Sequence, residues 1–166
     1  MDSTAQQQAV VIVDLGRQHL RLEQEGRILL SAAVSTAAGG AGELRDSGCT
    51  PRGWHAIRAR IGDGCPPNTV FVGRRPTGEI YTPDLAARHG ARDWILTRIL
   101  WLGGLERGRN RGGRVDTLRR YIYIHGCPDE IPLGVPGSHG CIRMRNDDVI
   151  ALFEQVRVGT RVYIHE

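Results

Sequence analysis

Short apolar or alternating runs recur along most of the chain and predict a mainly β fold. Glycine, proline and turn residues separate these runs about every eight to twelve residues, a spacing typical of a β-sandwich or barrel. The runs lie at residues 9–14, 18–23, 28–35, 53–61, 69–73, 78–81, 119–126 and 160–166, and the first three are predicted to form a meander. Residues 93–102 have the length of a helix, but their Ile, Thr and Trp content and the glycine pair that follows favour a strand.

One helix stands out, near residues 146–157. Asn146 is a good N-cap, and Asp147 and Asp148 complement the positive end of a helix dipole. One apolar face follows at helical spacing, made of Val149, Ile150, Leu152, Phe153 and Val156. We therefore expect a mainly β (α+β) domain with one well-marked helix.

The length of the chain fits a single domain. Its 166 residues lie within the range of about 100 to 200 residues for one core. We expect a short N-terminal tail over residues 1–8 and one domain over residues 9–166. The stretch from Thr36 to Pro51 is rich in glycine and alanine, and it predicts a surface loop beside a site. No stretch reaches the roughly 18 apolar residues of a membrane helix, so we expect no membrane partner.

The N-terminus bears on where the protein resides. Residues 1–14 lack a basic start, an apolar core and a small-residue cleavage site, the features of an export signal. The expected location is therefore the cytoplasm if Met1 is the natural start. It is the periplasm if a signal peptide has been removed from the sequence.

Every basic residue is an arginine, and there are 22 of them, which leaves a net charge of +4. This charge favours anionic partners, but a codon-composition bias towards arginine explains it as well. The densest cluster, RGRNRGGR at residues 107–114, resembles an RNA-binding segment. Because it has no aromatic neighbours on which bases stack, we expect a solvated loop and no nucleic-acid partner.

Residues 125–143 hold two of the six histidines and two of the four cysteines, in the sequence HGCPDEIPLGVPGSHGCIR. A cysteine nucleophile needs a nearby base or cation, and an imidazole is the usual partner. For Cys141 the candidates are His139, two residues away, and His125, at the end of a predicted strand. The strand end is the better platform for a base. The glycine before Cys141 permits a turn in which the N–H groups of Gly140 and Cys141 point at one spot, an arrangement that stabilises an oxyanion.

Two other interpretations of this cluster stay open. In the first interpretation, Cys141 is a buried structural thiol. In the other, His125, Cys127, His139 and Cys141 supply two imidazoles and two thiolates to zinc. Each ligand pair is separated by one residue, however, whereas zinc ligand pairs are usually separated by two to four. We therefore expect no metal and no cofactor, and we interpret the four cysteines as thiols rather than as a disulfide framework.

The same residues resemble a known family. HGCPDEIPLGVPGSHGCIRM, from residue 125, is similar to the active-site motif of the L,D-transpeptidase catalytic domain, which has the YkuD-like fold. VVIVDLGRQHLRLEQEGRILLSAAVST resembles the opening strands of that family, and TPRGWH at residues 50–55 resembles its Thr-Pro-x-Gly turn. The resemblance extends from about Val10 to Glu166 and implies a YkuD-like β-sandwich or barrel of mixed sheets.

The resemblance also implies roles for the central residues of the motif. Cys141 is the nucleophile, His125 accepts and returns the proton, and the backbone carbonyl of Gly126 orients that imidazole. His139, Gly140 and Cys141 form the oxyanion-binding turn.

For the flanking positions of the motif, the resemblance implies less specific roles. Ser138 and Arg143 match substrate-binding positions, and Arg143 either holds a substrate carboxylate or buttresses the loop. Cys127 departs from the small polar residue that more commonly follows His-Gly, so it is assigned no role.

The reaction that the resemblance implies is acyl transfer at the L,D-peptide bond of a peptidoglycan tetrapeptide stem. A thioester forms between Cys141 and the L-centre of diaminopimelate, and D-alanine leaves. With water as acceptor the protein is a cytosolic L,D-carboxypeptidase acting on recycled stems or muropeptides, and we expect this outcome. The alternatives are a periplasmic L,D-transpeptidase and a non-catalytic domain that binds peptidoglycan or a polyanion. A carbapenem is expected to acylate Cys141.

Overall fold

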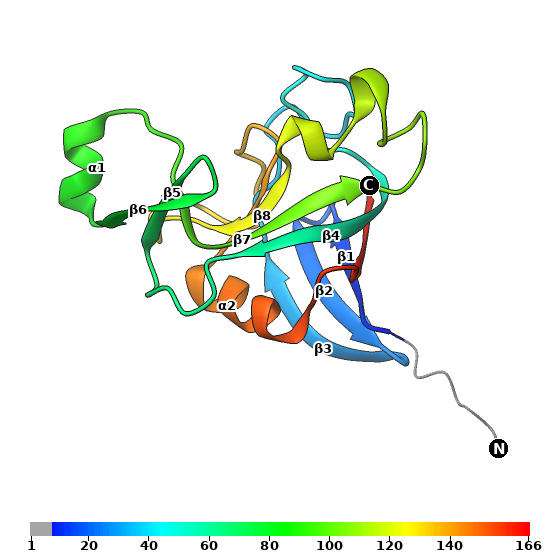
Figure 1. The fold of residues 1–166 in the computed structure, drawn as a ribbon, viewed down its shortest axis with the longest axis horizontal. Helices are drawn as coiled ribbons and strands as arrows, with labels where there is room; N and C mark the ends of the chain where they lie inside the picture. Colours follow the sequence, from blue (N-terminus) through cyan, green and yellow to red (C-terminus); the bar gives the residue numbers. More distant parts are fainter. Residues whose placement is uncertain (1–7) are drawn as a thin grey trace.

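A computed structural model describes residues 8–166 of the chain, so all but the last residue of the predicted tail at 1–8 lies outside the described residues. Ten strands and two α-helices follow one another along the chain (Figure 1). Their bounds are β1 Val10–Asp14, β2 His19–Gln24, β3 Arg27–Ala33, β4 Gly53–Ile61, β5 Thr69–Val72, β6 Arg75–Ile80, α1 Pro83–His89, β7 Ile95–Gly104, β8 Tyr123–Gly126, β9 Ile142–Met144, α2 Asn146–Gln155 and β10 Arg161–His165. The predicted mainly β fold is confirmed.

All ten strands belong to one mixed sheet. Its main path runs β3-β2-β1-β10-β4-β7-β5-β6, while β8 pairs with β7 and β9 pairs with β8. The β1–β10 and β8–β9 pairs are parallel, and the other pairs are antiparallel. The predicted meander of the first three strands is therefore present, and the last strand of the chain inserts between the first strand and β4.

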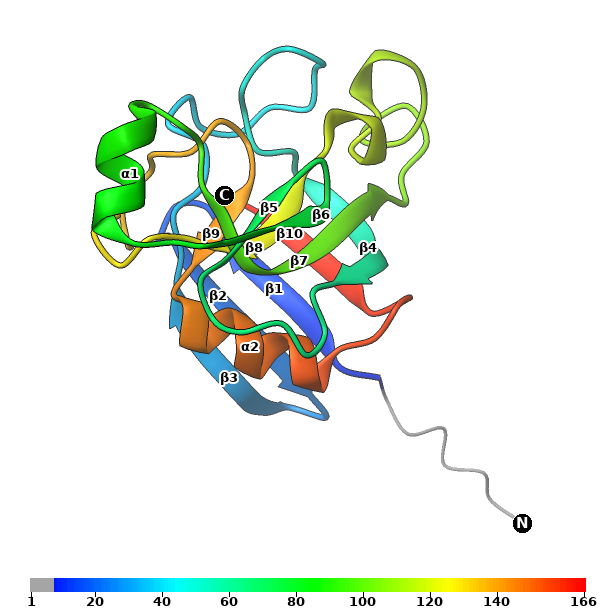
Figure 2. The same cartoon turned by 60° about the vertical axis from the view of Figure 1, so that its left-hand side comes forward.

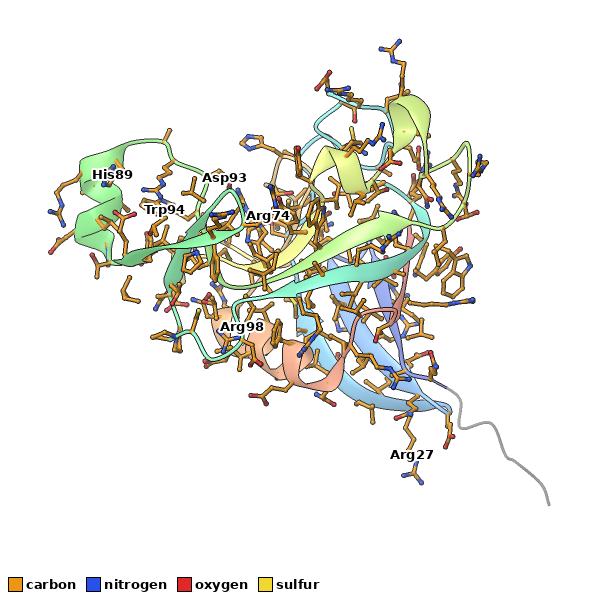
Figure 3. The ribbon with its side chains drawn as sticks, viewed as in Figure 1. Arg27, Arg74, His89, Asp93, Trp94 and Arg98 are labelled. Carbon is orange, nitrogen blue, oxygen red and sulfur yellow. The ribbon has the colours of Figure 1, made fainter. Side chains whose placement is uncertain are left out.

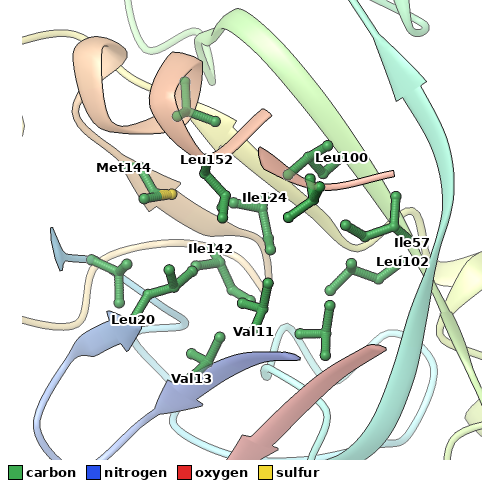
Figure 4. Close-up of a cluster of buried hydrophobic side chains, with 14 of the residues drawn as sticks. Val11, Val13, Leu20, Ile57, Leu100, Leu102, Ile124, Ile142, Met144 and Leu152 are labelled. Atoms are coloured by element: carbon green, nitrogen blue, oxygen red, sulfur yellow. The ribbon is translucent and has the colours of Figure 1, made fainter. Parts of the chain in front are cut away.

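The main core lies between this curved sheet and α2 (Figure 4). Val11 and Val13 of β1, Leu20 of β2 and Ile124 of β8 are fully buried there, and Leu152 of α2 packs with them. Side chains alternate along β1 and β2, so that every second one is buried in this core. This alternation made the two strands predictable from the sequence. Residues 93–102 were predicted to be a strand, and β7 confirms this.

The prediction of one helix was incomplete, because α1 is a second one. Thr82 caps it by accepting a hydrogen bond from the Leu85 N–H at 3.1 Å, and Pro83 begins it. The helix has only seven residues and buries none of them, so it has no long apolar face for a periodicity argument to detect.

The predicted N-cap at Asn146 was wrong, since Asn146 is the first helical residue and Arg145 precedes it as the cap. The side-chain amide of Asn146 is engaged elsewhere. Its oxygen accepts from the Thr97 hydroxyl at 2.6 Å, and its nitrogen donates to the side chain of Asn68 at 3.0 Å. Asn146 therefore ties α2 to β7, through Thr97, and to the residue before β5, Asn68, instead of capping its own helix.

Two other boundaries differ from the predictions. The strand predicted at 119–126 begins only at Tyr123, after a 3₁₀ turn over Leu118–Arg120. The three-residue strand β9 was not predicted, because it is too short to show alternation.

The loop predicted over residues 36–51 is confirmed as an irregular segment. Together with the segment between β7 and β8, it emerges at the same end of the sheet (Figure 2). The two segments are in contact, because the backbone N–H of Arg45 donates to the carbonyl of Arg114 at 2.7 Å. These segments enclose the end of the sheet where the second His-Gly-Cys lies.

Candidate active site

Strands β8 and β9 place the motif side chains on one face of the sheet. They run in parallel with His125 opposite Arg143 and Ile124 opposite Ile142. Because side chains alternate along a strand, Ile124 and Ile142 enter the main core, whereas His125 and Arg143 point to the opposite face. Cys141 immediately precedes β9 and lies on the same side as Arg143.

That opposite face lines a cavity of about 320 Å³. Five of the predicted site residues line it, namely His125, Ser138, His139, Cys141 and Arg143. The rest of the lining was not predicted and consists of Phe71, Gly73, Arg74, Asp93, Ile95, Ile99, Tyr121 and Tyr123. Gly126 and Gly140 do not line it and act through their backbones, as described below.

His125 is 1% exposed and is held by its neighbour. Its Nδ1 lies 2.6 Å from the carbonyl oxygen of Gly126, which is the contact that the resemblance implies. Since a carbonyl only accepts, Nδ1 carries the hydrogen and Nε2 carries a lone pair. Nε2 is buried and has no hydrogen-bond partner within residues 8–166. Burial also lowers the pKa of His125, so the imidazole is neutral with a free basic nitrogen.

Gly126 is a glycine for a steric reason. A Cβ at this position would come within 2.7 Å of the Leu96 carbonyl oxygen and within 3.1 Å of the Thr97 Cβ. The register between β7 and β8 shifts at this point, between Leu96 and Ile99. This irregularity brings the β7 backbone against Gly126, the residue that follows His125.

The sulfur of Cys141 contacts two backbone groups. It accepts from the Tyr123 N–H at 3.4 Å and donates to the Tyr121 carbonyl at 3.4 Å. Burial raises the pKa of the Cys141 thiol to about 12. At neutral pH the resting pair is therefore a thiol and a neutral imidazole rather than a thiolate and an imidazolium.

Cys127 has a different environment from Cys141. It is fully buried, its sulfur donates to the Met144 carbonyl at 3.3 Å, and it does not line the cavity. Burial raises its pKa to about 11. No role was assigned to Cys127, and its environment is that of a packed structural thiol.

The turn before Cys141 uses its N–H groups differently from the prediction. Gly140 has a φ of 132°, which favours glycine. Its N–H donates to the Ser138 hydroxyl at 3.2 Å, and that hydroxyl donates to the Cys141 carbonyl at 2.6 Å. The N–H of Cys141 has no hydrogen-bond partner within the described part of the chain. Of the three residues assigned to this turn, Gly140 thus uses its N–H within the turn, whereas the N–H groups of His139 and Cys141 have no partner in the described residues.

A residue that the sequence did not assign supports this turn. Thr50 is fully buried, and its hydroxyl donates to the Gly140 carbonyl at 2.9 Å while accepting from the Ala37 N–H at 3.0 Å. Thr50 begins the TPRGWH segment that resembles the family's Thr-Pro-x-Gly turn. The sequence therefore singled out this segment, but it did not show that Thr50 binds the turn before Cys141.

The contacts of Arg143 are of the kind that supports the surrounding loops. Its guanidinium donates to the Gly137 carbonyl at 3.2 Å and to the Asp93 carboxylate at 3.1 Å. Its side chain is only 12% exposed. Asp93, which comes from the loop between α1 and β7, is a second residue that the motif could not reveal.

The structure does not bring the proposed zinc ligands together. Within residues 8–166 no group of three or more His, Cys, Asp or Glu residues is arranged to hold a metal ion. The sulfur of Cys127 points away from the cavity that the other three residues line. All four cysteines are free thiols. In that same part of the chain, no helix is both long and apolar enough to cross a membrane.

Comparisons with known proteins agree with this geometry. Residues 8–164 match the YkuD family model, described as the L,D-transpeptidase catalytic domain. The probable L,D-transpeptidase YbiS of Escherichia coli K12 is 51% identical over 106 residues, which cover 62% of this chain and 34% of that protein. The putative L,D-transpeptidase YkuD of Bacillus subtilis is 39% identical over 66 residues, which cover 37% of this chain and 40% of that protein. The match thus spans about a third of the E. coli relative.

Solved structures share the fold. L,D-transpeptidase 3 from Mycobacterium tuberculosis superimposes with a TM-score of 0.60 at 16% identity, over 96% of this chain and 62% of that one. LD transpeptidase LdtMt1, solved in complex with imipenem, gives a TM-score of 0.58 at 16% identity over 96% and 59% of the two chains. With its motif, cavity and family match, the chain belongs to the L,D-transpeptidase catalytic domain family.

Proposed function

We propose that this domain catalyses cysteine-dependent acyl transfer at the L,D-peptide bond of peptidoglycan tetrapeptide stems, with water as the final acceptor. It would then be a cytosolic L,D-carboxypeptidase that trims stems or muropeptides. The observation that carries the proposal is the lone pair on His125 Nε2, buried and unpartnered in the cavity that also holds the Cys141 thiol.

The chemistry follows from these groups. As the Cys141 sulfur attacks the carbonyl carbon of the L-centre, His125 Nε2 takes the thiol proton. The oxyanion accepts a hydrogen bond from the free Cys141 N–H. His125 then returns the proton to the departing nitrogen of D-alanine, which leaves a thioester. Water, deprotonated by His125, hydrolyses the thioester and regenerates the thiol.

Cavity size supports hydrolysis. At about 320 Å³ the cavity is at the small end of the range for ligand sites, roughly 300 to 1,000 Å³. This volume suits the end of one stem better than two stems side by side.

An adjoining feature favours the second candidate, a periplasmic L,D-transpeptidase that forms cross-links. A hollow of about 400 Å³ shares Tyr121 and His139 with the cavity and is flanked by Arg45 and Arg119. An acceptor stem in this hollow would approach the thioester from the side of His139. The names of the relatives also favour transpeptidation.

The test is to incubate the protein with a soluble tetrapeptide and follow D-alanine and tripeptide by mass spectrometry, with and without an acceptor stem. Tripeptide as the main product in both cases supports the carboxypeptidase, whereas a dominant cross-linked product supports the transpeptidase. Cell fractionation of the native organism tests the cytosolic location.

Matched cysteine variants identify the nucleophile. Cys141→Ala is expected to abolish both products, and Cys127→Ala, at the other His-Gly-Cys, is expected to keep most of the activity. A carbapenem should add one acyl group to the wild type and to Cys127→Ala but none to Cys141→Ala. Labelling of Cys141→Ala would overturn the assignment, and full retention of peptidoglycan or polyanion binding without turnover would favour the non-catalytic alternative.

A further inference from the structure

The cavity contains one arginine whose charge is not neutralised. Two arginines line it, Arg74 and Arg143. Arg143 is paired with Asp93 at 3.1 Å. Arg74 forms no ion pair with any Asp or Glu of residues 8–166. A cation without a counter-ion at the edge of a concave site is a ready partner for an anionic ligand group.

Aromatic side chains hold the Arg74 guanidinium in place. It lies 4.8 Å from the ring centre of Trp101 and 5.0 Å from that of Tyr121, both within the range of cation–π attraction. It also donates to the Tyr123 hydroxyl at 3.0 Å. These contacts restrain the planar group but leave most of its five N–H donors without a protein acceptor. The guanidinium is therefore oriented before any ligand arrives.

The backbone at Arg74 is equally well defined. Val72 pairs with Arg75, so Gly73 and Arg74 form the two-residue loop of the β5–β6 hairpin. Their φ values are 56° and 65°, as in a type I′ turn. Glycine or asparagine adopts this conformation more readily than arginine does. Figure 3 shows Arg74 beside the tip of this hairpin, toward the rest of the sheet.

Tyr123 connects Arg74 with the nucleophile. Its backbone N–H is 3.4 Å from the sulfur of Cys141, and its hydroxyl is 3.0 Å from the Arg74 guanidinium. Arg74 thus lies about one tyrosine side chain from the reacting sulfur. In a bound stem, the carboxylate of the residue after the attacked carbonyl and the side-chain carboxylate of the acyl donor both lie within a similar reach.

We propose that Arg74 is a specificity-determining residue that binds a carboxylate of the stem peptide. This carboxylate belongs either to the leaving D-alanine or to the diaminopimelate side chain. The proposal rests on the function proposed above. It explains how a largely apolar cavity selects a substrate end that carries a negative charge.

Three substrates and four proteins test it. The substrates are the unmodified tetrapeptide, its C-terminal amide and its diaminopimelate side-chain amide, and tripeptide formation gives kcat/KM for each. The proteins are the wild type, Arg74→Gln, Arg74→Lys, and Arg75→Gln as the matched control, because Arg75 is the next residue of the same hairpin and does not line the cavity. Thermal unfolding of each protein checks that the fold is kept.

One of the two amides is expected to lower wild-type kcat/KM by about 10- to 100-fold, the usual range for a lost charged hydrogen bond. The affected amide identifies which carboxylate Arg74 binds. Arg74→Gln should show the same loss on the unmodified peptide and no further loss on that amide. Arg74→Lys should recover part of the preference, and Arg75→Gln should behave as the wild type.

Two results would overturn the role of Arg74 while leaving the proposed function intact. One is a wild type that accepts all three substrates equally. The other is an Arg74→Gln variant that loses activity by the same factor on all three, which is what a purely structural role predicts. Absence of tripeptide from every substrate with the wild type would instead contradict the proposed function itself.

Discussion

At the residue scale, backbone groups control the reactivity of Cys141 more than charged side chains do. Its sulfur contacts the Tyr123 N–H and the Tyr121 carbonyl, and burial keeps it as a thiol at neutral pH. His125 is also neutral and has a free Nε2. Charge therefore develops only as the carbonyl is attacked. In the proposed mechanism the position of the Cys141 N–H, an unpartnered donor of the turn, therefore matters for the oxyanion.

Thr50 is expected to determine the direction of that N–H. A trans peptide is planar, so fixing the Gly140 carbonyl through the Thr50 hydroxyl also fixes the Cys141 N–H on the opposite side. Thr50→Val keeps the shape of the side chain but removes the hydroxyl. We expect this variant to lower kcat for D-alanine release by about tenfold or more with little change in KM, as measured by steady-state kinetics.

Thr50→Ser provides the control, because it retains the hydroxyl and is expected to keep most of kcat. The Thr50→Val variant should also lose about 1–3 kcal/mol of unfolding free energy, since the Gly140 carbonyl and the Ala37 N–H lose a buried partner. Equal losses of kcat in both variants would show that the hydroxyl does not act on the oxyanion site.

At the scale of elements, the irregular register between β7 and β8 brings Gly126, the residue after His125, against the β7 backbone. Gly126→Ala is predicted to displace both α2 and β7 from β8, because the new Cβ would clash with the Asn146 side-chain oxygen and lie within 2.7 Å of the Leu96 carbonyl oxygen. Overpacking of this kind costs about 1–3 kcal/mol. Urea unfolding should report that loss, and kcat should fall as well because the Gly126 carbonyl that orients His125 moves.

Gly16→Ala is a suitable comparison. Its nearest heavy atom outside the neighbouring residues would be 3.4 Å from the added Cβ, an ordinary contact, and it lies in the β1–β2 turn and does not line the cavity. This variant should keep both stability and kcat. If Gly126→Ala matched it, the close approach of β7 would have no functional consequence.

The strands that alternate over a buried core were predictable from the sequence, as β1, β2 and β10 illustrate. The elements α1 and β9 were not, because a helix of seven residues and a strand of three carry too few periodic positions. The same distinction applies to the candidate site. The motif revealed the residues that lie close together in sequence, whereas Arg74 and Asp93 reach the site through tertiary contacts that no local pattern encodes. Thr50 lies in the TPRGWH segment, but its contact with Gly140 is likewise tertiary.

At the scale of the whole molecule, buried histidines make the stability depend on pH. His55 is fully buried outside the catalytic cavity. Its Nδ1 donates to the Gly53 carbonyl at 3.0 Å, so its Nε2 accepts from the Thr117 hydroxyl at 2.9 Å. Burial lowers the pKa of His55 to about 4, from 6.5 in an unfolded chain. Below pH 6.5 the unfolded state therefore binds a proton that the folded state does not, and the contribution of neutral His55 is lost progressively down to pH 4.

Urea unfolding at pH 7.5 and pH 5 measures this effect. The wild type should lose about 2 kcal/mol from His55 alone at pH 5, and His125, whose pKa is also lowered, adds to the loss. His55→Gln should be less stable at pH 7.5 but less sensitive to pH, whereas His89→Gln, on the surface helix α1, should keep the wild-type pH dependence. An undiminished pH dependence in His55→Gln would place the acid sensitivity elsewhere. A reduced one would show that His55, which links β4 to Thr117, sets much of the acid sensitivity of the fold.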